Sequence, residues 1–244
     1  MDFTLLCCLA VRAAREEGLP SLVARTSRFC RDVLNRIACV HRVYICRFDL
    51  AGLDAWPRLS NPCGFEAHFV SSHADADSLV EQGYEDLRAR FFRARDSLDA
   101  GAVALCAYRG ERLAHIGWVA RSPHQKLRFD VVPYRVDFEH GEACLGSVFT
   151  LPEYRGHGLA PYSMRLRLEY LRSLGYSATF AAVETENMAS LRAMERVGPF
   201  TRRPALHVKL PCINYVRYAG EIEPVSQVPV SAREDFACSS DGNQ

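Results

Sequence analysis

Hydrophobic and polar positions follow two different periods along this chain, and the two periods predict helices and strands in mixed order. Apolar residues recur at helical spacing in four segments. The predicted helices cover residues 1–41, 77–98, 156–174 and a short stretch after Asn187. Runs rich in β-branched and aromatic residues predict strands. The predicted strands cover residues 43–50, 102–108, 113–120, 127–138, 142–150, 178–184, 206–210 and 215–218.

These elements divide the chain into three parts. Residues 1–41 form a helical N-terminal extension, residues 42–220 form one α/β domain, and residues 221–244 form a polar tail that we expect to be disordered. Between Arg12 and Arg47 the chain has eight arginines against three acidic residues. The basic helix of the extension could dock weakly on an anionic membrane surface or an acidic carrier protein. It could equally pack its apolar stripe on the domain and leave its arginines in water.

Charge and cysteine usage narrow the function classes. Thirty basic and 29 acidic residues leave no global field, so we expect no nucleic-acid partner. The ten cysteines form no Cys-x-x-Cys pair and no zinc spacing, and we expect reduced thiols in a cytoplasmic protein. The apolar run at 3–11 is too short to span a bilayer and follows no basic segment.

The most informative segment lies between the strand at 142–150 and the following helix. Gly156, Gly158 and Ala160 have small side chains, so an anion could approach the main chain closely there. The start of a helix presents free backbone N–H groups and the positive end of the helix dipole. The pattern therefore predicts a binding site for a phosphorylated cofactor.

Two motifs follow one another in this part of the chain. Arg155-Gly-His-Gly-Leu-Ala160 fits R/Q-x-x-G-x-G/A, and Asn187-Met-Ala-Ser190 with Gly198-Pro-Phe200 fits N-x-x-S/A ending in G-F. Over residues 142–200 the sequence resembles the GNAT superfamily of acyl-coenzyme A-dependent N-acyltransferases. The resemblance implies an α/β fold with a mixed, mostly antiparallel central sheet and helices on both faces. Two strands of that sheet would part to make a slot for pantetheine.

The resemblance also implies roles for particular residues. Acetyl-CoA or another acyl-CoA would be the co-substrate, and no metal is required. The pantetheine arm would bond to the backbone of one strand end and to one side chain, with a small residue nearby. These residues are Val148, Phe149, Thr150, Asn187 and Ser190. The pyrophosphate would be surrounded by the loop and helix start, made of Arg155, Gly156, His157, Gly158, Leu159 and Ala160. We expect the His157 side chain to point to solvent or touch a phosphate.

Amine acylation needs a base, because the ammonium must lose a proton before it attacks the thioester. Glu142 is the candidate, since it lies 13 residues before Arg155 at the start of the same strand, where many family members have a general base. In an apolar cleft the pKa of this carboxylate would be raised towards the useful range. Glu139 and His140 are rivals, and Glu142 could also be an exposed strand-end residue.

The departing thiolate raises a second question. Family members often have a tyrosine as general acid before the G-F step, whereas this chain has Met194 there. Possible substitutes are Tyr162, Tyr215 and Tyr218, each of which could also be a packed aromatic residue. We expect Cys144 to be a buried strand residue rather than a nucleophile. Trp118 is expected in the core or the cleft wall.

The sequence therefore predicts transfer of an acetyl or other acyl group from acyl-CoA to a primary amine, by direct attack in a ternary complex. The acceptor would be a small molecule or a carrier-linked group, and its identity stays open, as does the oligomeric state. Transfer to a hydroxyl or a carrier thiol is an alternative on the same fold. A non-catalytic acyl-CoA-binding module is an alternative of another class.

Overall fold

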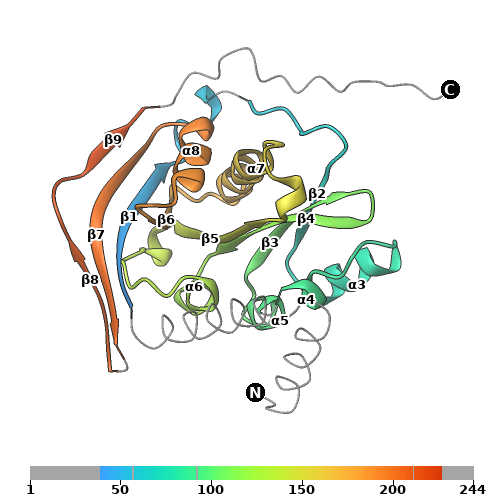
Figure 1. The fold of residues 1–244 in the computed structure, drawn as a ribbon, viewed down its shortest axis with the longest axis horizontal. Helices are drawn as coiled ribbons and strands as arrows, with labels where there is room; N and C mark the ends of the chain where they lie inside the picture. Colours follow the sequence, from blue (N-terminus) through green and yellow to red (C-terminus); the bar gives the residue numbers. More distant parts are fainter. Residues whose placement is uncertain (1–38, 57, 92, 211, 227–244) are drawn as a thin grey trace, which may run out of the picture.

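The computed structural model describes residues 39–56, 58–91, 93–210 and 212–226. Their centre is a nine-stranded sheet in the order β2-β3-β4-β5-β6-β1-β7-β8, with β9 paired to β7 (Figure 1). The strands are β1 (Cys39–Asp49), β2 (Glu66–Val70), β3 (Val103–Arg109), β4 (Arg112–Ala120), β5 (Glu142–Thr150), β6 (Ala178–Glu184), β7 (Phe200–Leu210), β8 (Ile213–Tyr218) and β9 (Glu223–Val225). All neighbours pair antiparallel except β5 and β6, which are parallel.

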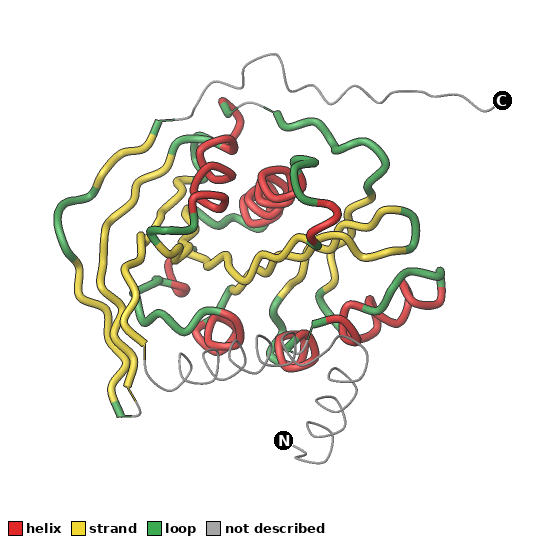
Figure 2. The backbone as a smooth tube through the Cα atoms, in the orientation of Figure 1, coloured by secondary structure: helices red, strands yellow, loops and turns green. Residues whose placement is uncertain are grey.

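Helices cover both faces of this sheet, as the red helices and yellow strands of Figure 2 show. The longer helices α7 (Leu159–Ser173) and α8 (Met188–Val197) lie on one face. The opposite face has α3 (His73–Glu81), α4 (Leu87–Arg90), α5 (Ala94–Asp99) and α6 (Pro123–Phe129). Single 3-10 turns are η1 (Leu53–Ala55), η2 (Phe138–His140) and η3 (Pro152–Tyr154). The predicted mixed, mostly antiparallel sheet with helices on both faces is confirmed.

The core under α7 and α8 is built from apolar residues of both helices and of β1, β5 and β6. Leu168 and Leu171 of α7 are fully buried there, and Phe48 of β1 stacks on Phe200 with ring centroids 4.9 Å apart. Gly198 lies against Trp56, and a Cβ at Gly198 would collide with the indole. The G-F step after α8 is therefore a close packing contact that holds α8 against the core.

Two predicted elements differ from the structure. The helix predicted over 77–98 is three short helices: α3 begins earlier, at a capping box made by Ser72 and Asp75, and a left-handed Gly83 follows its end. The strand predicted over 127–138 is wrong, because Ser122 caps α6 and Pro123 is its first residue. The alternating apolar residues that follow α6 pack onto the sheet as an irregular segment instead of pairing with it.

Smaller differences lie at the edges of the predicted elements. The short edge strand β2 was not predicted, and β1 begins at Cys39, inside the predicted N-terminal extension. The polar tail begins with β9, which pairs with β7. The rest of the extension, including the basic helix predicted for it, and the rest of the tail lie outside the described residues.

Among the described residues, most cysteines lie in the sheet. Cys39, Cys46, Cys106, Cys144 and Cys212 are free thiols, as expected. Cys63 is disulfide-bonded, which corrects the expectation of reduced thiols for this residue. No helix in the described part of the chain has the length and hydropathy to cross a bilayer.

Candidate active site

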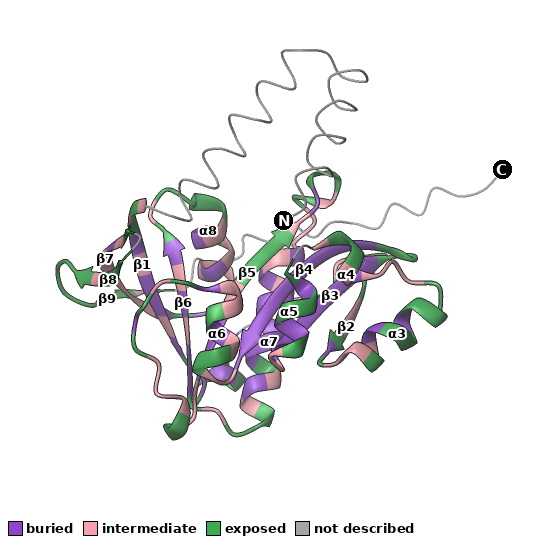
Figure 3. Ribbon diagram, turned by 90° about the horizontal axis from the view of Figure 1, so that it is seen from below, coloured by how far each residue is buried: buried purple, intermediate pink, exposed green. Residues whose placement is uncertain are grey.

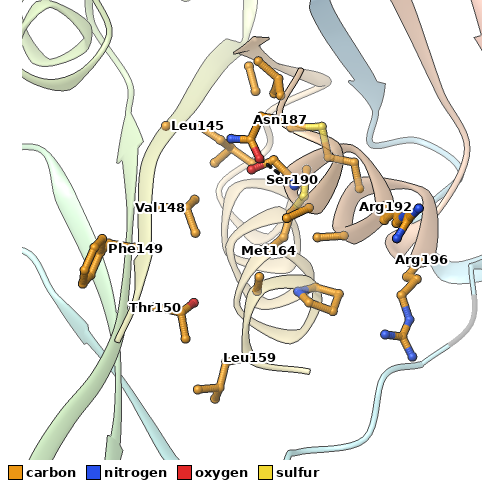
Figure 4. Close-up of a pocket in the computed structure, with 18 of the residues that line it drawn as sticks. Leu145, Val148, Phe149, Thr150, Leu159, Met164, Asn187, Ser190, Arg192 and Arg196 are labelled. Atoms are coloured by element: carbon orange, nitrogen blue, oxygen red, sulfur yellow. Dashed lines mark hydrogen bonds between the residues drawn. The ribbon is translucent and has the colours of Figure 1, made fainter. Parts of the chain in front are cut away.

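The central sheet opens where β5 and β6 meet. The two strands pair over three residues, from Glu142 opposite Ala178 to Cys144 opposite Phe180, and then separate. A cavity of about 880 Å³ lies in the opening, lined by both strands, α7 and α8 (Figure 4). The last part of β5 turns from buried to exposed as it leaves β6 (Figure 3). Backbone groups of β5 in this part are therefore available to a ligand.

A β-bulge interrupts β5 beside this cavity. Ile116 pairs with Phe149 and Trp118 pairs with Gly146, so Ser147 and Val148 together oppose the single residue Gly117. Ser147 has a positive φ of 46°, which is uncommon for a residue with a side chain. Bulges of this kind remove groups from the ladder and redirect them, and Ser147 and Val148 both line the cavity.

The loop after β5 forms one wall of the cavity. Gly156 and Gly158 have φ values of 84° and 76°, and a Cβ built on either glycine would meet nothing within 4 Å. Gly158 is the N-cap of α7 and makes no side-chain cap, so the first N–H groups of α7 lack a side-chain partner there. The loop thus combines open space, free N–H groups and the positive end of a 15-residue helix.

Asn187 begins α8 on the other side of the opening. Its Oδ1 accepts a hydrogen bond of 3.1 Å from the backbone N–H of Ser190, which fixes the side chain at the helix start. Both residues line the cavity and face it in Figure 4. Asn187 is therefore the N-cap of α8, at the start of the short helix that the sequence predicts after it.

The structure brings together nearly all the residues that the sequence predicts for cofactor binding. The cavity lining includes Val148, Phe149, Thr150, Arg155, Gly156, Gly158, Leu159, Ala160, Asn187 and Ser190. His157 is outside the lining; its ring lies 5.8 Å from that of Phe65, and its Nδ1 lies 3.2 Å from the carbonyl oxygen of Arg155. The binding roles of the ten lining residues stay predictions, and the structure shows that these residues lie around one cavity.

A match to a family model covers residues 67–198 and is described as the acetyltransferase (GNAT) family. This range includes the loop, the bulge and α8. The chain belongs to the acetyltransferase (GNAT) family. A comparison with curated proteins gives no match.

Among solved structures, similar folds occur in other family members. A GCN5-related N-acetyltransferase from Sphaerobacter thermophilus is 15% identical over 82% of this chain and 57% of its own, with a TM-score of 0.42. An acetyltransferase from Colwellia psychrerythraea is 12% identical over 80% of this chain and 62% of its own, with a TM-score of 0.43. The chain thus spans less than two thirds of the length of these two proteins.

A third structure, yncA from Salmonella typhimurium, was solved with its cofactor acetyl-CoA. It is 13% identical over 70% of this chain and 99% of its own, with a TM-score of 0.42.

Several charged residues of this GNAT cavity were not predicted. Its lining includes Arg167 of α7, Arg192 and Arg196 of α8, and Glu184 at the end of β6. Together with Arg155, the lining has four arginines and one carboxylate. Such an excess of positive charge suits a polyanionic ligand. Arg167 could have been found from the sequence, because it lies on the apolar face of the helix among Met164, Leu168 and Leu171.

Arg167 is 1% exposed and makes no ion pair within the described residues. Its Nε donates to the carbonyl oxygen of Ser163 and its Nη1 to that of Trp118, each at 3.2 Å. Burial lowers the pKa of Arg167 to about 10, which still leaves the guanidinium charged at neutral pH. A Cβ at Gly117 would come within 2.7 Å of Cζ, so the head group lies against β4 opposite the bulge.

Behind Thr150 lies a buried histidine. Nδ1 of His115 is hydrogen-bonded to Oγ1 of Thr150 at 2.7 Å, and the ring is fully buried. Burial, and secondarily the charge of Arg167, lowers the pKa of His115 to about 3. The ring is therefore neutral at physiological pH, and it is too weak a base to take a proton from an ammonium.

Glu142 does not line the cavity. Its Oε2 accepts the backbone N–H of Asp137 at 2.7 Å, at the closed end of the opening where β5 and β6 still pair. The rivals Glu139 and His140 are also outside the lining, and His140 pairs with Asp137 at 2.8 Å. The structure therefore does not bring the predicted base to the cavity.

Glu184 is the carboxylate that the structure brings to the cavity instead. Ala181 and Val183 pack in the core under α7 and α8, whereas Ala182 packs on the opposite face. Because side chains alternate along a strand, Glu184 lies on the same face as Ala182. Its Oε1 is 3.6 Å from Nδ1 of His41 on β1.

The remaining candidates are placed as follows. Met194, at the position where the family often has tyrosine, is buried and lines the cavity. Tyr162 and the exposed Tyr215 and Tyr218 are outside the lining, while Tyr154 belongs to it. Cys144 is fully buried, with its Sγ 2.9 Å from the hydroxyl of Tyr134, and burial raises the pKa of this thiol. This surrounding agrees with a structural cysteine.

Proposed function

We propose that this GNAT protein transfers an acyl group from acyl-CoA to a primary amine, by direct attack in a ternary complex. The observation that supports this best is the cavity between β5 and β6, which joins the α7 N-terminus to the bulge of β5. One end offers free N–H groups to phosphates, and the other offers unpaired strand backbone to amides. Coenzyme A has both groups, in that order, along its length.

The order of these groups sets the direction of the ligand. The pyrophosphate would lie at Gly156 to Ala160, and the pantetheine amides would bond along β5 from Thr150 back to Val148. The thioester would then lie at the bulge, near Ser147. The arginines Arg192 and Arg196 at the side of the cavity would add charge for the CoA phosphates (Figure 4).

In the transfer step the amine nitrogen attacks the thioester carbonyl carbon, the carbon–sulfur bond breaks and CoA leaves as its thiolate. An unperturbed thiol has a pKa of about 8.5, so the thiolate can leave without prior protonation. The excess proton of the amine must reach a base. Glu184 is our candidate, directly or through one water, because it lines the cavity at the end of β6, where this strand has separated from β5. An amine could then approach from the face opposite α7.

A pair of conservative variants tests this assignment. We expect E184Q to lower kcat by roughly 10²-fold or more and to keep the affinity for CoA, since the amide cannot accept the proton. The matched variant E142Q retains an amide oxygen that can accept the Asp137 N–H, and it should change kcat little. Release of free CoA with a panel of amines measures turnover, and calorimetry measures CoA affinity.

The same measurements separate the alternatives. A large loss in E142Q with none in E184Q would return the base to Glu142. CoA binding without CoA release for any amine, alcohol or thiol acceptor would indicate a binding module and contradict the proposed transfer.

A further inference from the structure

Arg167 is a buried cation that the protein itself does not neutralise. Its partners are two backbone carbonyls, and Nη2 has no hydrogen-bond partner among the residues that the structure describes. A buried charge without a counter-ion is costly, and such charges are normally paired. Arg167 also lines the cavity, so a ligand can supply the missing anion.

The neighbours of Arg167 define where that anion would lie. The guanidinium rests on Gly117, the β4 residue opposite the bulge, and any side chain at Gly117 would collide with it. Leu145, Met164 and Met194 line the same cavity and are buried. The charge is therefore held in apolar surroundings, where a charge-assisted hydrogen bond is strong and selective.

This position is separate from the site for the CoA phosphates. Leu159 and Arg167 are eight residues apart in one helix, so their Cα atoms are separated by roughly 12 Å along α7. The guanidinium reaches back by about one turn, to the carbonyl of Ser163, and still lies beyond the first turn of the helix. It lies at the bulge, where the proposed function places the thioester and the acyl group. A plain acetyl group offers no anion to Arg167, whereas an acyl chain that ends in a carboxylate does.

We propose that Arg167 recognises a carboxylate on the acyl group, so that the donor is the CoA thioester of a short dicarboxylic acid. This inference rests on the proposed function, because it assumes that the donor follows the path along β5. The planar guanidinium suits a carboxylate, which it can bind through more than one N–H group. The bound carboxylate in turn neutralises the buried charge.

Two thioesters of equal chain length test the proposal on the wild-type protein. Succinyl-CoA and butyryl-CoA both have four acyl carbons, and only succinyl-CoA has a terminal carboxylate. We expect calorimetry to give succinyl-CoA a dissociation constant roughly 10- to 100-fold lower than that of butyryl-CoA, the usual range for a hydrogen bond to a charged group. Equal binding, or tighter binding of butyryl-CoA, would overturn the proposal.

Variants then assign the preference to Arg167. R167M should abolish the preference for succinyl-CoA while free CoA still binds, and R167K should keep part of it because a charge remains. R165M is the matched control: Arg165 is a buried arginine of the same helix, but it pairs with Glu169 and does not line the cavity. The ratio of the dissociation constants of butyryl-CoA and succinyl-CoA should be the same in R165M as in the wild type. A wild-type ratio in R167M contradicts the proposal. If R167M does not fold, a wild-type ratio in R167K contradicts it.

A further experiment distinguishes failure of the carboxylate site from failure of the proposed acyl-CoA function. If neither CoA nor any thioester binds the wild type, the proposed acyl-CoA function is wrong. Free succinate then tests Arg167 alone, by the shift it causes in the melting temperature. A shift in the wild type that R167K reduces supports the carboxylate site, and the absence of that difference overturns it.

Discussion

At the residue scale, burial decides what the titratable groups near the cavity can do. His115 and Arg167 are both enclosed, and each has a pKa lowered by loss of solvent. His115 is neutral and its hydrogen bond positions Thr150, whereas Arg167 stays charged and can bind an anion. His115, behind the cavity wall, is therefore neutral at neutral pH, whereas Arg167, in the wall itself, is charged.

The state of His115 predicts a dependence of stability on pH. Its pKa is about 3 in the folded protein and 6.5 when the side chain is fully solvated, so the unfolded chain takes up a proton first as the pH falls. The contribution of His115 to the free energy of unfolding is fully present above pH 6.5 and is lost progressively as the pH falls to 3. At pH 5 the expected loss is about 2 kcal/mol. Urea titrations of the wild type and H115Q between pH 7 and 5 measure it.

The variant H115Q should remove this part of the pH dependence, even if it is less stable at pH 7. The matched control is H124Q, since His124 is exposed on α6. We expect the free energy of unfolding of H124Q to depend on pH as it does in the wild type. A wild-type slope in H115Q would mean that His115 is not the titrating group.

Single residues were predicted well where the chemistry is local. Gly158 and Asn187 could be found because a turn and a helix cap each depend on a few neighbouring residues. The position of Glu142 outside the cavity lining could not be predicted, because its strand was predicted correctly but the point where β5 leaves β6 was not visible. That point depends on pairing between segments about 36 residues apart in the chain.

At the element scale, the N-terminus of α7 combines a strained cap with open space. Gly158 has a positive φ, which a residue with a Cβ adopts at a cost of roughly 1 kcal/mol. The space where its Cβ would lie is empty in the protein, and we expect the CoA pyrophosphate to occupy it. The glycine thus serves both the turn and the ligand.

The variant G158A separates these two roles when it is compared with G175A. Gly175 lies after the C-terminal end of α7, also has a positive φ, and also has no atom within 4 Å of its Cβ position. We expect both variants to lose about 1 kcal/mol of stability in chemical denaturation. G158A alone should weaken CoA binding, by about 10-fold or more, measured by calorimetry. Equal CoA affinity in the two variants would show that the loop does not contact the pyrophosphate.

Elements were predictable where start and stop signals agree with the hydrophobic period. The β3–β4 hairpin satisfies this condition, since Arg109 to Arg112 form its turn. Residues 127–138 do not, because their alternating apolar side chains are typical of a strand while Ser122 and Pro123 begin a helix. The cap determines the structure of the first part, and packing on the sheet determines the rest.

At the scale of the whole molecule, the first described strand occupies an interior place in the sheet. β1 lies between β6 and β7, so it pairs on both sides with strands more than 120 residues later in the chain. A local pattern predicts β1 as a strand, but nothing local predicts its neighbours. The strand order therefore could not be derived from the sequence alone.

This position predicts a gradient of protection in hydrogen exchange. The amides of β1 around Cys46 are buried and bonded on both sides, whereas β8 is an edge strand with mostly exposed residues. We expect β1 amides to exchange roughly 10²-fold or more slowly than those of β8, since edges open by local fluctuations. Native-state exchange read by mass spectrometry measures both strands in one sample. Similar rates would contradict the interior position of β1.

The separation of β5 from β6 gives this sheet two interior edges in addition to its outer ones. Exposed edges normally invite pairing by other polypeptide strands. Here α7 and α8 flank the opening, so a narrow chain of amides could enter where a full polypeptide strand could not. A ligand that bonds to both edges would act as a removable strand. Its binding would then stabilise the folded sheet by an amount that rises with ligand concentration relative to the dissociation constant.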